Sequence, residues 1–317
     1  MKQPTETPRP RIIAVVGPNA SGKSGYAVAL ARLFQGEVVS ADSRQVYRGL
    51  DLGTGKITPK EMREIPHHLI DIVDPGQDYS LFDFQRDAYS AIDDISGAGK
   101  LPILAGGTGL YVAAVTEGYQ LLDVKPDPVL RRELESLSTG ELADILEREQ
   151  PGAIGQVENR HKRRLIRAIE IIRAGFDYRE TRKKSPKLDA LIIGVQWKKN
   201  VLRRRIRERL QARLDQGMIE EVEGLRARGV PDPFLYKMGL EYRAILRYLE
   251  GGYDSRAHFV ERLEIAIGQF AKRQMTWFRG RAGVNWIAGE DLMSAPVLER
   301  IRDFPEVSEK QRFQGIQ

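Results

Sequence analysis

The sequence predicts an α/β fold in which a parallel β-sheet is flanked by helices and interrupted by a helical insertion. An apolar, β-branched run at 12–16 leads through a glycine-containing loop into a helical pattern at 26–34. Strand and helix patterns then alternate up to residue 111, which favours parallel strands joined by crossover helices. A strand-free, helix-patterned stretch at 129–181 precedes another strand pattern at 189–197, which indicates an insertion between strands of one sheet.

The loop after the first strand has the spacing of a phosphate-binding motif. It reads GPNASGKS over residues 17–24, the pattern GxxxxGK[ST] between a strand and a helix. The glycines let successive backbone N–H groups point inward, and the helix N-terminus adds partial positive charge. We therefore expect a P-loop NTPase-like sheet that binds a di- or triphosphate through Gly17, Pro18, Asn19, Ala20, Ser21, Gly22, Lys23 and Ser24. The Ser24 hydroxyl is the expected Mg²⁺ ligand.

The second predicted strand, at 37–41, ends in Asp42 and Ser43. Because the carboxyl ends of parallel strands face the ligand crevice, both residues are expected near the phosphate site. Position alone leaves Asp42 as a turn residue, a magnesium ligand or a general base. A third strand pattern at 67–73 is followed by a turn, where Asp71 or Asp74 is a candidate Walker B acid, although Asp74 before Pro75 is more simply a turn residue.

A helix is expected at 80–95, followed by a strand at 101–105 and the sequence GGTG at 106–109. Small residues here let a backbone or a flat ligand approach closely, or they form a tight turn. The expected domains are a discontinuous catalytic core, 11–121 and 188–317, and a helical insertion, 122–187, after a polar leader at 1–10 that is expected to be disordered. Further helices are expected at 200–228, 238–250 and 255–278, and a short strand at 284–287.

The composition restricts the class of protein. The 317 residues include no cysteine, which excludes a disulfide framework and a cysteine-ligated zinc finger and suits a cytoplasmic protein. No apolar run is long enough to span a membrane. The net charge is +6, and basic residues gather in two runs, 160–167 and 198–213. Each run is either a solvated helix face or part of a nucleic-acid footprint.

These patterns leave three classes of function open. A group-transfer enzyme that acts on RNA would use a diphosphate-bearing donor. A small-molecule kinase would use the helical insertion as a lid, but such a large basic surface is unusual for it. A nucleic-acid-dependent ATPase needs an apolar Walker B strand that ends in an acid, and Leu69-Ile70-Asp71 is short for that role.

Several strings of residues together resemble one family, the tRNA dimethylallyltransferases, also called tRNA isopentenyltransferases. They lie in order along nearly the whole chain: the P-loop at 17–24, SADSRQVYRGLDLGTGK at 40–56, PHHLIDIVDP at 66–75, GGTGLY at 106–111 and AKRQMTWFR at 271–279. The resemblance implies transfer of a dimethylallyl group from dimethylallyl diphosphate to the exocyclic amine of the adenine 3′ of the tRNA anticodon, with Mg²⁺ as cofactor. A bacterial-type, cytoplasmic monomer is expected.

The resemblance also implies roles for individual residues. Asp42 takes the place of the family's general base, and Lys23 and Thr108 join it in the catalytic set. Contacts to the tRNA anticodon stem-loop are expected from Asp42, Ser43, Arg44, Gln45, Thr108, Arg131, Arg163, Arg164 and Arg167. Tyr236 stands where some members carry an arginine that contacts the diphosphate, so that contact is assigned to Arg273, with Lys237 as the alternative.

Overall fold

The computed structural model describes residues 9–157 and 160–304, which form two compact units. The core unit holds the described residues up to Thr116 and from Leu188 onward, and the insertion unit spans Glu117–Lys187. The sequence predicted an insertion at 122–187. Most of the leader predicted at 1–10 lies outside the described residues.

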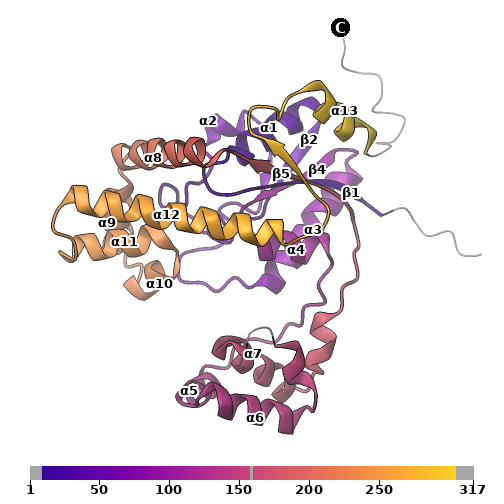
Figure 1. The fold of residues 1–317 in the computed structure, drawn as a ribbon, viewed down its shortest axis with the longest axis vertical. Coiled ribbons are helices and arrows are strands. Elements are labelled where there is room, and N and C mark those ends of the chain that lie inside the picture. Colours follow the sequence, from indigo (N-terminus) through magenta and orange to yellow (C-terminus); the bar gives the residue numbers. More distant parts are fainter. Residues whose placement is uncertain (1–8, 158–159, 305–317) are drawn as a thin grey trace, which may run out of the picture. The chain divides into compact units, whose positions relative to one another are not determined.

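The core unit is built on a six-stranded parallel sheet, so the predicted fold class is confirmed (Figure 1). The strands run in the order β3-β2-β4-β1-β5-β6. Their bounds, in that order, are His67–His68, Gly36–Ser40, Leu101–Gly106, Arg11–Val16, Asp189–Gln196 and Val284–Ala288. Val16 at the end of β1 pairs with Gly106 of β4 and Gly194 of β5, so the strands end together at one edge of the sheet.

Helices cover both faces of this sheet with their apolar sides. On one face, α1 (Lys23–Leu33) and α13 (Ala295–Asp303) bury Leu30 and Ile301 among the strand side chains. On the other, α3 (Leu81–Gly97) and α4 (Gly109–Thr116) pack through Phe84 and Tyr111, whose rings stack 3.9 Å apart. Burial of such side chains stabilises the fold by about 1.5–3 kcal/mol each.

A further group of helices packs around the loop at 46–50. It consists of α8 (Lys199–Asp215), α9 (Met218–Ala227), α10 (Asp232–Lys237), α11 (Leu240–Leu249) and α12 (Arg256–Arg279), drawn in red to orange in Figure 1. The single helix predicted at 200–228 is wrong. The helix breaks after Asp215, and Gly217 adopts a φ of 97°, a left-handed conformation in which glycine is favoured.

Three short helices were not predicted: α2 (Pro59–Met62), α10 and α13. They are four, six and nine residues long, too short for a clear apolar period. The predicted strand at 67–73 is also shorter than expected. After His68 the backbone at Leu69 turns to a φ of 61°, which ends β3.

The insertion unit is helical. Its elements are α5 (Pro128–Ser136), α6 (Thr139–Glu149), α7 (Lys162–Arg173) and the 3-10 helices η1 (Ala153–Gln156) and η3 (Tyr178–Arg182). Leu134, Leu142 and Leu165 are fully or almost fully buried in its own apolar core. Neither unit contains, among its described helices, one that is long and apolar enough to cross a membrane.

Candidate active site at the carboxyl edge of the sheet

Three neighbouring strands carry the predicted catalytic residues to the same edge of the sheet. β1 continues into the P-loop, β2 is followed by Asp42, and β4 by Thr108. Because β4 lies between β1 and β2, the GGTG turn lies between the P-loop and Asp42. Ala41 N donates to Ala105 O over 2.8 Å, and Thr108 N donates to Ala41 O over 3.3 Å, which ties the turn to the Asp42 segment.

The P-loop bends back toward its lysine. Ala20 and Gly22 adopt positive φ angles of 62° and 90°, and α1 begins directly afterwards at Lys23. The Lys23 ammonium donates to Pro18 O over 3.4 Å. Burial and, to a lesser extent, the Arg209 guanidinium together lower the pKa of Lys23 to about 8, although the Asp42 carboxylate acts in the opposite direction. A diphosphate at this lysine would stabilise the charged form and raise the pKa again.

Side chains from distant elements hold the loop in place. Gln274 of α12 accepts from Asn19 N over 2.9 Å and donates to Gly107 O over 3.0 Å, so one buried amide joins the P-loop to the GGTG turn. Trp197, just after β5, donates to Ser21 O over 2.8 Å. Arg205 of α8 donates to Ala20 O over 2.8 Å. These bonds preorganise the loop before any phosphate arrives.

Close approach explains why two positions of the turn are glycine. A Cβ on Gly106 would lie 2.1 Å from the carbonyl oxygen of Ala41. A Cβ on Gly107 would lie 2.6 Å from Nε2 of Gln274 and 3.4 Å from the Lys23 ammonium. Any larger residue at these positions would collide with Ala41, Gln274 or Lys23. It would therefore disrupt the close packing of the P-loop, the GGTG turn and the Asp42 segment.

Asp42 is oriented by its own loop. Its Oδ1 accepts from the backbone N of Arg44 over 2.9 Å, an Asx-type turn, while no described residue donates to Oδ2. Thr108 Oγ1 accepts from Ser43 N over 3.1 Å, so Thr108 and the Asp42 segment form one unit. The carboxylate keeps one oxygen available to accept a proton, which is the geometry that a general base requires.

The structure also brings together three arginines that the sequence analysis placed only in a basic run. Arg205, Arg209 and Arg213 are spaced four apart and share one face of α8. Arg209 donates to Gly55 O over 2.7 Å, and Arg213 donates to Leu52 O and Gly53 O over 2.5 and 2.7 Å. The spacing of four residues was the signal in the sequence that could have distinguished these three inward-facing arginines from the exposed basic residues of the same run.

The loop at 51–53 is bound by charges of both signs. The Glu221 carboxylate accepts from the backbone N–H groups of Asp51, Leu52 and Gly53 over 2.6–3.0 Å, and from the Tyr242 hydroxyl over 2.8 Å. A Cβ on Gly53 would lie 2.3 Å from the Tyr242 ring, so the ring packs directly on this backbone. Gln45, a predicted tRNA contact, donates to Gly55 O, two residues after this loop, over 3.3 Å.

The predicted tRNA contacts in the insertion unit have two different environments. Arg163 and Arg164 are exposed in the first turn of α7. Arg131 and Arg167 instead lie 2.7 and 3.4 Å from the buried Glu170 carboxylate. Although burial works against ionisation of Glu170, the Arg131 guanidinium and its hydrogen bonds lower the pKa of that carboxyl. Arg131 and Arg167 therefore have a structural role within the unit.

The remaining candidates lie apart from the P-loop contacts. Arg273 is exposed, with its guanidinium carbon 5.7 Å from the Phe270 ring centroid on the same helix, so its contact with the diphosphate stays a prediction. Tyr236 and Lys237 are exposed on α10. Asp71 pairs with Lys56 over 2.5 Å and Asp74 with Arg48 over 2.9 Å. These pairings do not support a Walker B role for either acid.

The donor atoms of the P-loop fit Mg²⁺ only together with a bound phosphate. Among the described residues, no three acidic or histidine side chains gather into a metal site. Ser24 is half-buried in the first turn of α1 and offers one hard hydroxyl oxygen, a ligand type that Mg²⁺ accepts. No described residue forms a hydrogen bond with the buried Ser21 hydroxyl, whose oxygen would lie 2.9 Å from a Cβ on Gly17. It thus provides a polar group within the P-loop itself.

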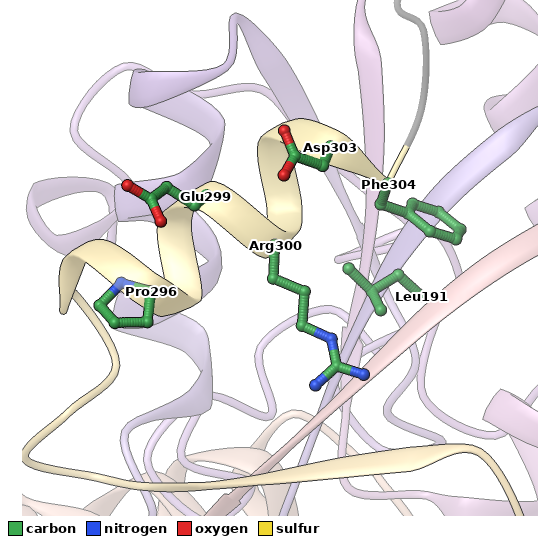
Figure 2. Close-up of a pocket in the computed structure, with 6 residues that line it drawn as sticks. All are labelled: Leu191, Pro296, Glu299, Arg300, Asp303 and Phe304. Atoms are coloured by element: carbon green, nitrogen blue, oxygen red, sulfur yellow. The ribbon is translucent and has the colours of Figure 1, made fainter.

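A hollow of about 510 Å³ lies elsewhere in the core unit, between α13 and β5 (Figure 2). Figure 2 shows the carboxylates of Glu299 and Asp303 on one side of the helix and the Arg300 guanidinium on the other, with Phe304 facing Leu191. Leu191 pairs with Ile13, well before the end of β1, so the hollow does not belong to the carboxyl edge. It contains none of the predicted site residues.

Comparison with known proteins shows the family of the chain. A family model described as IPP transferase matches residues 45–281, and a model described as isopentenyl transferase matches residues 10–72. The tRNA dimethylallyltransferase 1 of Geotalea daltonii is 46% identical over 282 residues, 88% of this chain and 91% of the relative. That of Geotalea uraniireducens is 43% identical over 302 residues, 93% of this chain and 98% of the relative.

Solved structures show the same likeness. The full-length tRNA isopentenylpyrophosphate transferase of Bacillus halodurans matches with a TM-score of 0.70 and 37% identity, covering 93% of this chain and 97% of its own. A eukaryotic dimethylallyltransferase acting on tRNA matches with a TM-score of 0.77 and 25% identity, covering 92% and 77%. Since both the family model and these relatives cover most of the chain, the protein belongs to the IPP transferase family, whose members include the tRNA dimethylallyltransferases.

Proposed function

We propose that the protein is a tRNA dimethylallyltransferase that transfers a dimethylallyl group from dimethylallyl diphosphate to the exocyclic amine of the adenine 3′ of the anticodon. The observation that carries the proposal is the single edge on which Asp42, Thr108 and the P-loop lysine meet, joined by Gln274. Membership of the family supports the reaction and the tRNA substrate. A cytoplasmic monomer without a membrane partner completes the proposal.

The P-loop is suited to the leaving group of this reaction. As the allylic C–O bond breaks, its electron pair passes to the diphosphate, and negative charge grows on the phosphate oxygens. Loop N–H groups, the Lys23 ammonium and the nearby Arg209 guanidinium stabilise that charge. Mg²⁺, held by Ser24 and the diphosphate oxygens, would supply further charge neutralisation. Arg273 is retained as a proposed diphosphate contact.

Asp42 is suited to the nucleophile. The adenine amine attacks the cation-like allylic carbon, a new N–C bond forms, and the proton lost from nitrogen passes to the Asp42 carboxylate. Oδ1 is held by Arg44 N, so Oδ2 is the oxygen that receives it. The amine is a poor nucleophile, and its positioning beside the donor by Thr108 and the Ser43–Gln45 segment contributes as much as basicity. The base must leave its stack to reach this edge.

The test is a direct product assay. Purified protein is incubated with Mg²⁺, dimethylallyl diphosphate and unmodified tRNA, and the RNA is digested and its nucleosides are weighed. We expect dimethylallyl-adenosine that disappears without donor and with a tRNA lacking adenine next to the anticodon. Isopentenyl diphosphate, which is not allylic, should give no product. Absence of product together with ATP turnover on a metabolite would indicate a kinase, and ATP turnover stimulated by RNA alone would indicate an ATPase.

A further inference from the structure

We propose that Tyr236 is a stacking platform for an unpaired nucleobase of the RNA substrate, a neighbour of the adenine that reacts. This inference rests on the proposed function, because it assigns a second RNA contact to the same site. It concerns recognition of the substrate and gives Tyr236 no part in bond making.

The first observation is exposure. Of the described Phe, Tyr and Trp side chains, only Tyr236 and Phe176 are exposed, at 59% and 45%, and Phe176 belongs to the insertion unit. Tyr236 is therefore the one exposed aromatic ring among the described residues of the core unit. A tyrosine ring is a large apolar surface that usually packs in a core or at an interface. Its exposure here indicates that the ring is covered when a partner binds.

The second observation is the orientation of α10. Leu235 is fully buried, Phe234 contacts Tyr47 edge to face with 5.2 Å between centroids, and Met238 Sδ lies 4.0 Å from Nη1 of Arg44. These residues attach the helix to the segment that begins at Asp42. Tyr236 and Lys237 project from the other side of the same short helix into solvent. The helix that carries the exposed ring is thus packed against the loop that carries the proposed general base.

The third observation is charge. The guanidinium carbon of Arg243 lies 5.7 Å from the centroid of the Tyr236 ring, and Lys237 is exposed beside it. Two acids near this ring are already paired: Asp232 of α10 with Arg226, and Glu241 of α11 with Arg213. An aromatic face between exposed cations is the combination that binds single-stranded RNA, because the ring stacks a base while the cations attract its phosphates. An apolar peptide would not require these cations.

The chemistry of the proposed reaction supplies a reason for such a platform. When the target adenine leaves its stack for Asp42, the adjacent base loses a stacking partner. The Tyr236 ring would replace that partner and hold the loop in its opened form. Since every base has a π-face, this contact selects unpaired nucleotides and not a particular sequence. Tyr236 would therefore contribute to the affinity for the opened anticodon loop.

The experiment uses the full chain and an anticodon stem-loop RNA with the fluorescent base 2-aminopurine, placed in turn on each side of the target adenine. Stacking on an aromatic ring quenches this base. We compare wild type with Tyr236→Ala, Tyr236→Leu, Tyr236→Phe and Tyr236→Trp, and with Ile265→Ala as a control at an exposed apolar side chain of α12. Binding is measured without donor, and kcat and KM are measured with it.

We expect quenching at one of the two positions with wild type, Tyr236→Phe and Tyr236→Trp, and its loss with Tyr236→Ala and Tyr236→Leu. The last two variants should bind RNA about 5- to 100-fold more weakly, with KM for dimethylallyl diphosphate unchanged. Unchanged quenching and affinity in Tyr236→Ala would overturn the inference, as would full affinity in Tyr236→Leu, which would indicate a merely apolar contact. Failure of the proposed function is distinct, since wild type would then yield no modified adenosine.

Discussion

The two basic helices, α7 in the insertion unit and α8 in the core unit, look alike in sequence but have different environments. In α8, Arg205, Arg209 and Arg213 turn inward and donate to backbone carbonyls of the P-loop and of the loop at 52–55. In α7, Leu165 and Ile169 form the inward face, and the arginines of the first turn are exposed. This difference shows that a run of basic residues can line the interior of a candidate active site as well as a protein surface.

The two helices are therefore expected to contribute to different steps. Changes on the α8 side, at the carboxyl edge, should affect chemistry and donor binding. Changes on the α7 side should affect tRNA affinity or the stability of the insertion unit.

The largest effect is expected for Asp42→Asn at the carboxyl edge. The variant keeps an oxygen that can accept from Arg44 N but loses the basic carboxylate, so kcat should fall about 10³-fold. Single-turnover product formation measures this. Asp74→Asn, at an acid paired with Arg48 on the surface, is the matched control and should retain activity. A loss in Asp42→Asn of less than about tenfold would remove Asp42 from the role of general base.

The next largest effect is expected for Arg209→Gln on the inward face of α8. Loss of this cation should lower kcat/KM for the donor about 10²-fold, while tRNA affinity changes little. The pH profile gives a second readout. Lys23 has a pKa of about 8 in the free enzyme, so kcat/KM should fall as the pH rises through 8 and the ammonium loses its proton. Because Arg209 lowers that pKa, its removal should move the alkaline limb to higher pH.

Arg207→Gln is the control on the same helix, since Arg207 faces away and pairs with Glu264 over 3.0 Å. It should keep the wild-type activity and pH profile. An alkaline limb that stays in place in Arg209→Gln would contradict the coupling between Arg209 and Lys23.

A smaller effect is expected for the combined replacement of Arg163, Arg164 and Arg167 by alanine in α7. KM for tRNA should rise about tenfold with kcat unchanged, because binding of phosphates contributes affinity without chemistry. The slope of log affinity against log salt should decrease by nearly one for each phosphate that is no longer bound. Filter binding at several salt concentrations measures the slope. Arg163→Ala alone, which leaves the Arg167–Glu170 ion pair intact, separates RNA binding from stability. An unchanged slope would make this run a solvated face.

The smallest effect on catalysis is expected for Glu170→Gln, which tests the structural side of α7. The buried carboxylate accepts from Arg131 and Arg167, and its neutralisation should lower the free energy of unfolding of the insertion unit by about 2 kcal/mol. The lowered pKa of Glu170 means that this stabilisation is present at neutral pH and is lost as the pH falls through that pKa. Hydrogen exchange of the α7 amides measures it, with exposed Glu135→Gln as control. Equal protection in both variants would argue against this ion-pair role.

Much of the fold could be predicted because its signals are local. The P-loop spacing, the β-branched strands and the strand-ending Asp42 and Thr108 are each contained in a few residues, and parallel strands bring such ends to one edge. Gln274 could not be assigned this way, since its hydrogen bond to Asn19 joins helix α12 to the first loop of the chain. The inward-facing position of the α8 arginines could not be predicted for a related reason. Without the position of Gly55, Arg209 resembles its exposed neighbours.

The clamp on the loop at 51–53 has a consequence for selectivity between anions. Three successive N–H groups that converge on one carboxylate form a nest, the same kind of backbone device that a P-loop offers to phosphate. In this chain the Glu221 carboxylate binds in that nest, in the place that a bound anion would take. Of the two such loops described above, the chain thus occupies one with its own carboxylate. A diphosphate donor would therefore bind at the other loop, beside Lys23, and not at the loop at 51–53.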